Sequence, residues 1–288
     1  MPDFELPIDS VKSSFTQFKR LGALPGGGQK LVYHATDAEG RSYALKIIRQ
    51  DRGPQDERTI REVMAAGKLN APFFPKIFDA QYCRINETNC IYIVEEFIDG
   101  QSLATILEEQ GAQSRSSIRE IGTALLEALV HIEQADLVHR DIKPGNIMIG
   151  PGGRVVIIDF GIARHLDQKS ITSPYAFFGP MTVGYCAPEQ IRNEKRLISV
   201  RTDLFAIGVV LYEMTTGRNP FREGCTSPQE ALERCLKFEP PSLLELGFPR
   251  GLSDFVQGCL AKASHRRPVS AHKALESFIS IQWEDMLS

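Results

Sequence analysis

Residues 138–149 read Val-His-Arg-Asp-Ile-Lys-Pro-Gly-Asn-Ile-Met-Ile, and residues 155–161 read Val-Val-Ile-Ile-Asp-Phe-Gly. This stretch contains two carboxylates, Asp141 and Asp159, together with the amide of Asn146 and the ammonium group of Lys143. Carboxylate and amide oxygens bind Mg²⁺, and cations neutralise phosphate oxygens. The stretch therefore predicts a site that holds a triphosphate with metal ions and transfers a phosphoryl group.

His139-Arg140-Asp141, with Asn146 five residues after the aspartate, resembles the catalytic loop of protein kinases. Asp159-Phe160-Gly161 resembles the metal-binding segment that follows it in these enzymes. Lys143, two residues after Asp141, is the form found in kinases that phosphorylate Ser and Thr. From about residue 15 to about 280 the chain resembles the eukaryotic-like (Hanks-type) serine/threonine protein kinases, in the compact form common in bacteria.

The resemblance implies that ATP and Mg²⁺ are the cofactors, with Mn²⁺ as an alternative metal. It also implies a role for each polar residue of the loop. Asp141 would accept the proton of the substrate hydroxyl, and Lys143 would bind the γ-phosphate during transfer. Asn146 and Asp159 would hold the metal ions. Protein Ser and Thr hydroxyls would be the acceptors, including those of the kinase itself.

The fold class implied is α+β, the bilobal kinase fold. A chain of 288 residues is long enough for two lobes. We expect a surface extension over residues 1–14, and an N-lobe over 15–98 with a small antiparallel sheet and one helix. Residues 99–288 would form a larger, mainly helical C-lobe.

The N-lobe is expected to begin with three short strands between Phe15 and Ile48, because apolar residues alternate there between turn-forming segments. Lys46, in the strand Tyr43–Ile48, would bind the α- and β-phosphates. The alternative is a lysine that only extends to solvent. The first turn contains Gly26, Gly27 and Gly28, a phosphate-binding loop by resemblance, but Lys30 occupies the position of the family's third glycine. A flexible hairpin turn is therefore the alternative.

A helix is expected from Asp56 to Asn70, and its Glu62 would pair with Lys46 by resemblance, with Glu57 or a solvated surface glutamate as alternatives. Two further strands are predicted at 77–82 and 91–96, followed by a hinge at 97–100.

Adenine would lie against the backbone of Glu96 and Ile98, with Val32 and Ala44 above the ring and Met148 below it. Each apolar residue among these could instead be ordinary core.

Glu95 occupies the position before the hinge where Met, Thr or a bulky apolar residue is commoner in the family. A carboxylate in a desolvated pocket costs free energy unless it is paired. We therefore hypothesise that Glu95 lies within reach of Lys46 and can compete with Glu62 for it. A solvated glutamate is the alternative.

Residues 159–189 lose regular periodicity, which is typical of a functional loop. The loop ends in Thr182-Val183-Gly184-Tyr185-Cys186-Ala187-Pro188-Glu189, resembling the closing motif of the kinase activation segment. Thr182 should contact Asp141 and Lys143. Arg140, directly before Asp141, resembles the arginine of those kinases in which a phosphate group on the activation loop pairs with arginine and orders the loop. The candidate phosphorylation sites are Ser170, Thr172 and Ser173.

Structural roles are implied for residues further along the chain. Glu189 should pair with Arg267, with Arg266 as the less favoured partner. Asp203 should begin a helix reaching about Thr216 and hold the catalytic-loop backbone. Helical periodicity predicts a core helix over 114–135 and later helices at about 228–238, 251–262 and 270–281.

Composition excludes several classes of function. The net charge of −3, without a basic block, argues against nucleic-acid binding. No apolar run approaches the ~18 residues of a membrane span, and the first residues do not resemble a signal peptide. Six cysteines without CxxC spacing argue against a zinc site or a disulfide scaffold and favour a cytoplasmic location. Cys83 and Cys90 could face each other across a hairpin, as inert thiols or as a redox switch.

Two other functions fit the same fold. A pseudokinase would bind partners without phosphoryl transfer. The irregular glycine loop and Glu95 favour it, whereas the complete set of catalytic polar residues argues against it. A small-molecule kinase is disfavoured by Lys143 and the long loop before Glu189. Oligomeric state, protein substrate and upstream signal are left open.

Overall fold

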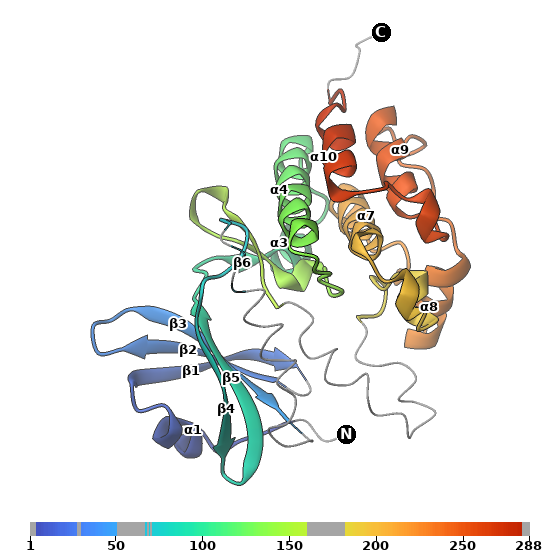
Figure 1. Ribbon diagram of the computed structural model, residues 1–288. Coiled ribbons are helices and arrows are strands. Elements are labelled where there is room, and N and C mark those ends of the chain that lie inside the picture. Colours follow the sequence, from blue (N-terminus) through green and yellow to red (C-terminus); the bar gives the residue numbers. More distant parts are fainter. Residues whose placement is uncertain are drawn as a thin grey trace. The chain divides into compact units, whose positions relative to one another are not determined.

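The computed structural model describes residues 4–27, 30–50, 71–159 and 182–283, with positions 67 and 69. The chain divides into two compact units. Among the described residues, unit 1 consists of 4–27, 30–50, 67, 69 and 75–99, and unit 2 consists of 71–74, 100–159 and 182–283. Over these described ranges, unit 1 contains a β-sheet and one short helix, and unit 2 is mainly helical (Figure 1).

The sheet of unit 1 has five antiparallel strands in the order β1-β2-β3-β5-β4. Their bounds are β1 Phe18–Gly27, β2 Lys30–Asp37, β3 Ser42–Arg49, β4 Ile77–Ile85 and β5 Thr88–Glu96. The five strands predicted from the sequence are therefore confirmed. The β4–β5 turn has Asn86 and Glu87 at φ 45° and 65°, as the tight hairpin turns that match strand twist require.

The two faces of this sheet differ in chemistry, because successive residues of a strand point to opposite sides. Leu45 and Ile47 of β3 are fully buried on one face, within an apolar cluster. Lys46, between them, points to the other face. Lys46 therefore lies on the face of the sheet opposite to the apolar cluster that contains Leu45 and Ile47.

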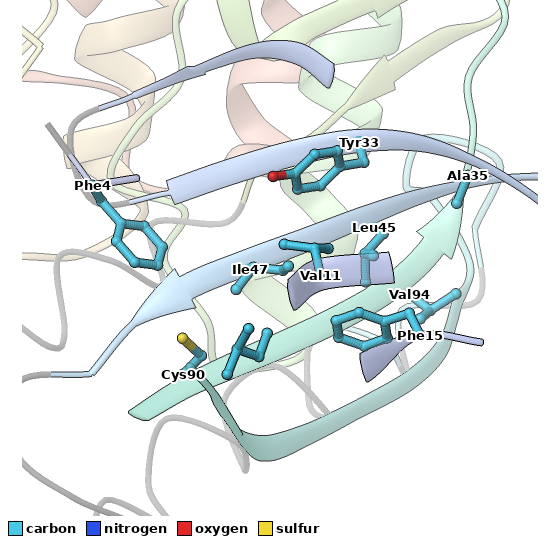
Figure 2. Close-up of a cluster of buried hydrophobic side chains, with 10 residues drawn as sticks. Phe4, Val11, Phe15, Tyr33, Ala35, Leu45, Ile47, Cys90 and Val94 are labelled. Atoms are coloured by element: carbon cyan, nitrogen blue, oxygen red, sulfur yellow. The ribbon is translucent and has the colours of Figure 1, made fainter. Parts of the chain in front are cut away.

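The apolar face is covered by the N-terminal segment, which corrects the expected surface extension over residues 1–14. Helix α1, Ile8–Ser14, places Val11 at 0% exposure, with Phe15 and Phe4 also buried against the sheet (Figure 2). Phe15 also makes an edge-on ring contact with Tyr92 of β5. Phe4, Val11 and Phe15 are therefore part of the core of unit 1, because an apolar sheet face must be removed from water, whereas most other residues of this segment are exposed.

Unit 2 consists of helices and a small three-stranded sheet (Figure 1). The helices are α3 Leu103–Gln110, α4 Arg115–Gln134, α6 Pro188–Ile191, α7 Val200–Thr216, α8 Pro228–Lys237, α9 Arg250–Cys259 and α10 Ala271–Ile279. The small sheet has the order β6 Gln101–Ser102, β7 Ile147–Ile149 and β8 Val155–Ile157. The helices predicted near 114–135, 228–238, 251–262 and 270–281 are confirmed, whereas α7 begins three residues before Asp203.

Serine residues define where five of these helices begin. The helices α3, α4, α7, α8 and α10 are each preceded by a serine whose side chain accepts a backbone N–H of the first turn: Ser102, Ser114, Ser199, Ser227 and Ser270. Such caps satisfy donors that the helix itself leaves unpaired. The beginnings of these helices are thus encoded locally.

All six cysteines are free thiols, and Cys83 faces Cys90 across the β4–β5 ladder as expected. Within the described ranges, none of the helices combines the length and the apolar composition that crossing a bilayer requires.

Candidate active site

The catalytic-loop backbone is held by helix α7. The carboxylate of Asp203 accepts the backbone N–H groups of His139 and Arg140, each at 2.7 Å. Arg140 has φ 67°, a conformation that costs free energy for a residue with a side chain. Its carbonyl accepts the side-chain amide of Gln190 at 3.0 Å. Contacts on both sides of Arg140 therefore fix the strained turn that leads into Asp141.

Asp141 is surrounded by hydrogen-bond donors. Its Oδ1 accepts the hydroxyl of Thr182 at 2.9 Å, and its Oδ2 accepts the amide of Asn146 at 3.0 Å. Lys143 Nζ lies 3.1 Å from the same Oδ2 and donates to Thr182 Oγ1 at 2.8 Å. The expected contact of Thr182 with Asp141 and Lys143 is confirmed, and four predicted residues form one polar network.

The residues expected to hold metal are Asn146 and Asp159. The Asn146 amide also donates to the Asp141 carbonyl at 2.9 Å, which directs its nitrogen toward the loop. The backbone carbonyl of Asn146 accepts the backbone N–H of Ile158 at 2.9 Å. This hydrogen bond links the residue before Asp159 to the loop that contains Asp141. Among the described residues there is no cluster of three or more His, Cys, Asp or Glu side chains suited to a metal. A small set of oxygen donors fits Mg²⁺, which commonly takes its other ligands from phosphates and water.

His139 supports the loop from inside the protein. Its side chain is fully buried, and Nδ1 accepts the N–H of Asp141 at 3.2 Å. The contact joins the backbone of the expected catalytic aspartate to the core of unit 2. His139 is thus a structural member of the motif.

In unit 1, Lys46 forms a buried ion pair with Glu95. Lys46 Nζ lies 2.5 Å from Glu95 Oε1, and the two side chains are only 6% and 8% exposed. The hypothesis that Glu95 lies within reach of Lys46 is therefore confirmed, and the solvated alternative is wrong. Competition with Glu62 stays a prediction.

The residues expected to surround adenine belong partly to unit 1 and partly to unit 2. In unit 1, Val32 is paired with Lys46 and Ala44 with Glu95, so the four side chains share one face of the sheet. The N–H of Glu96 donates to the carbonyl of Lys76 at 2.8 Å.

Two other residues expected to contact adenine belong to different units. Ile98 is buried in unit 1, whereas Met148 lies on β7 of unit 2. Their contact with adenine remains a prediction.

The glycine loop lies at the end of the β1–β2 ladder, where Gly27 pairs with Lys30. A Cβ atom at Gly26 would lie 2.5 Å from the backbone oxygen of Lys30. Gly26 therefore has a structural reason to lack a side chain. Several predictions fall outside the described residues. They are the helix expected over 56–70, apart from positions 67 and 69, and the residues Gly28, Glu57, Glu62, Phe160, Gly161, Ser170, Thr172 and Ser173.

A buried ion pair anchors the segment after Thr182. Arg267 donates from both terminal nitrogens to Glu189, at 2.6 and 2.9 Å, and the two side chains are 0% and 2% exposed. Thr202 also donates to Glu189 at 2.9 Å. The predicted pair is confirmed, and Arg266 is exposed.

Two contacts of this segment were not expected from the sequence. One is the Gln190 amide on the catalytic loop. The other joins the Tyr185 hydroxyl to Glu213 Oε2 of α7 at 2.5 Å. Burial raises the pKa of both Tyr185 and Glu213. In the sequence, the only signal for these two contacts is that polar residues such as Gln190 and Glu213 stand among apolar ones.

A pocket of about 420 Å³ lies beside Thr182 in unit 2. It is lined by Thr182, Val183, Arg222, Cys225, Thr226, Ser227, Pro228 and Ala231. The pocket is therefore next to the network that contains Asp141.

Comparison with known proteins places this geometry in a family. A family described as "Protein kinase domain" matches residues 15–279. The chain is 35% identical over 263 residues to a probable serine/threonine-protein kinase PknB of Bifidobacterium longum, covering 88% of the chain and 38% of that protein. It is 32% identical over 264 residues to the serine/threonine-protein kinase PrkC of Bacillus subtilis, covering 90% of the chain and 39% of that protein.

A solved structure, that of Rad53 residues 1–466 in complex with AMP-PNP, has a TM-score of 0.73 at 26% identity. The match covers 93% of this chain and 67% of the other. The chain spans only about two fifths of the length of the two bacterial relatives. The match to the family over most of the sequence, with the polar network around Asp141, shows that this chain belongs to the protein kinase family.

Proposed function

We propose that this chain is a serine/threonine protein kinase domain that transfers the γ-phosphate of ATP, with Mg²⁺, to protein hydroxyls. The observation that carries the proposal is the network joining Asp141, Lys143, Asn146 and Thr182. The network brings together a proton acceptor, a cation and a metal-binding amide. The bacterial relatives, named as serine/threonine-protein kinases, support this choice of acceptor.

Each residue of the network has a role in the proposed reaction. Asp141 Oδ1 orients the substrate hydroxyl and accepts its proton, and Lys143 neutralises charge on the transferred phosphoryl group. Asn146 and Asp159 would hold Mg²⁺, which neutralises charge on the phosphates when bound. The Thr182 hydroxyl donates to Asp141 and accepts from Lys143, so it fixes the distance between the Asp141 carboxylate and the Lys143 ammonium group.

The pocket beside Thr182 supports a peptide as the acceptor. Val183 and Ala231 give it apolar walls, and the exposed Arg222 adds a positive charge. A peptide residue next to the phosphorylated Ser or Thr could enter it. A free small molecule would need no such pocket beyond the acceptor site.

Phosphoryl transfer can be tested directly with the purified chain. It would be incubated with Mg²⁺ and ATP labelled on the γ-phosphate, alone and with casein, and the labelled amino acids identified. We expect label on Ser or Thr, and a loss of about 10² to 10⁴-fold in Asp141→Asn because the proton acceptor is removed. Asp254→Asn, an exposed aspartate of α9, is the matched control. Equal labelling by Asp141→Asn, or no labelling of protein by the wild type, would contradict the proposal.

A further inference from the structure

The ion pair between Lys46 and Glu95 is fixed by the register of two neighbouring strands. Ala44 of β3 is directly opposite Glu95 of β5, and Lys46 is opposite Ile93. Directly opposed residues, and residues two apart on one strand, point to the same face. Glu95 is therefore the diagonal neighbour of Lys46. The partner of the lysine comes from the sheet itself, three residues before Ile98.

The pair is buried, which determines its energetics. A charged side chain that is only 6–8% exposed has lost most of its hydration and needs an opposite charge or several hydrogen bonds. The strand neighbours of the pair on this face include Ala44, Ile93 and Ile91, whose side chains are apolar. Glu95 therefore supplies a buried opposite charge to Lys46 on this face of the sheet.

We propose that Glu95 is a positioning residue for nucleotide binding, holding the Lys46 ammonium at a fixed place on the sheet. The inference rests on the proposed function and on the expected role of Lys46, which is to bind the α- and β-phosphates of ATP. An ammonium group has three N–H donors and can hold a carboxylate and phosphate oxygens at once. Because strands β3 and β5 are joined by a continuous ladder, the lysine is placed before nucleotide arrives, and less of its side-chain entropy is lost on binding.

Two variants of Glu95 separate its charge from its shape. Glu95→Gln keeps the size and an acceptor oxygen but removes the charge, and Glu95→Met removes both. Glu39→Gln, an exposed glutamate of unit 1 with 65% side-chain exposure, is the control. Melting curves followed by circular dichroism would establish that each variant is folded. If Glu95→Met fails to fold, Glu95→Gln decides the outcome.

Nucleotide binding is measured by titration calorimetry with a non-hydrolysable ATP analogue and Mg²⁺, and turnover by KM for ATP and kcat. We expect the Kd and the KM for ATP to rise about tenfold in Glu95→Gln and more in Glu95→Met, because a hydrogen bond to a charged group is worth about 1.5–3 kcal/mol. The Glu39→Gln control should match the wild type. Unchanged or tighter nucleotide binding in a folded Glu95→Met would overturn the proposal, since the carboxylate would then be a bystander or a competitor.

A second readout does not depend on catalysis. The nucleotide-free proteins would be treated with acetic anhydride, and acetylation of Lys46 followed by peptide mass spectrometry. We expect faster acetylation of Lys46 in both variants, because removing one buried negative charge 2.5 Å away makes the amine neutral more often. Equal rates in wild type and variants would contradict the assigned contact. If the wild type transfers no phosphate, the proposed function fails, while binding and acetylation still test Glu95.

Discussion

Asp203 Oδ1 lies 2.7 Å from the backbone nitrogen of Arg140, 63 positions earlier in the chain. Its other oxygen accepts the N–H of His139, so one carboxylate of α7 satisfies two consecutive donors of the catalytic loop. A bidentate acceptor of this kind fixes the loop backbone more strongly than a single bond would. The position of Asp141 therefore depends on a helix that does not itself enter the reaction.

Replacing Asp203 by Asn should lower phosphoryl transfer without unfolding the chain. The amide has only one acceptor oxygen and carries no charge, so at least one of the two loop contacts is lost, at about 1.5–3 kcal/mol. We expect kcat to fall about 10- to 100-fold while the KM for ATP changes little. Steady-state kinetics would measure both. An exposed aspartate, Asp254, changed to Asn should have no effect, and an unchanged kcat in Asp203→Asn would contradict the role assigned to α7.

Replacing Thr182 tests the bridge between Asp141 and Lys143. Thr182→Val keeps the shape but removes the hydroxyl that donates to one residue and accepts from the other. We expect kcat to fall about 10- to 100-fold, because both lost hydrogen bonds involve charged groups. Thr182→Ser keeps the hydroxyl and should retain most of the activity. Similar kinetics for the Ser and Val variants would show that the hydroxyl is dispensable.

Removing Arg267 should destabilise unit 2 more than any change in its exposed arginines. Arg267→Met leaves the buried Glu189 carboxylate without its partner, which typically costs about 3–5 kcal/mol. Urea unfolding of the wild type and the variant would measure the loss. The neighbouring Arg266 is exposed, and Arg266→Met should unfold at nearly the same urea concentration as the wild type. Equal stability of the two variants would be inconsistent with a buried pair.

Lys262 should make stability depend on pH in the alkaline range. Its ammonium lies 4.3 Å from the ring centre of Phe221 and 5.5 Å from that of Phe205. Burial lowers the pKa of Lys262 from 10.5 to about 8. The folded state therefore binds fewer protons than the unfolded state between these values, so this lysine destabilises the fold below about pH 8 and the penalty disappears as pH rises toward 10.5.

Lys262→Met is the variant that tests this pH dependence. At pH 7 it should be more stable than the wild type, by on the order of 1 kcal/mol after loss of the ring contacts, and the difference should shrink as pH rises from 8 to 10. Urea unfolding across this range would measure it. Burial raises the pKa of the nearby Cys235 thiol to about 12, but that thiol is present in both proteins. A variant less stable than the wild type at pH 7 would contradict the expected penalty.

The sequence by itself determined the polar network around Asp141 and most of the regular structure among the described residues. Asp141, Lys143 and Asn146 lie within one loop, so their proximity follows from chain connectivity and from the motif. The alternation of Tyr43–Ile48 and the helical spacing of 114–135 are local signals, and both were confirmed as β3 and α4. Local patterns are readable because strand and helix geometry fixes which neighbours share a face.

Only the tertiary structure decided which distant groups meet. The seven-residue α1 is too short for a clear periodicity, and only the apolar face of the sheet explains why Val11 and Phe15 are buried. The Gln190 contact with Arg140 likewise carries no local signal, because a single amide can serve any nearby carbonyl. Such pairings depend on how whole elements pack, since removing apolar surface from water and satisfying buried polar groups are properties of the assembled fold.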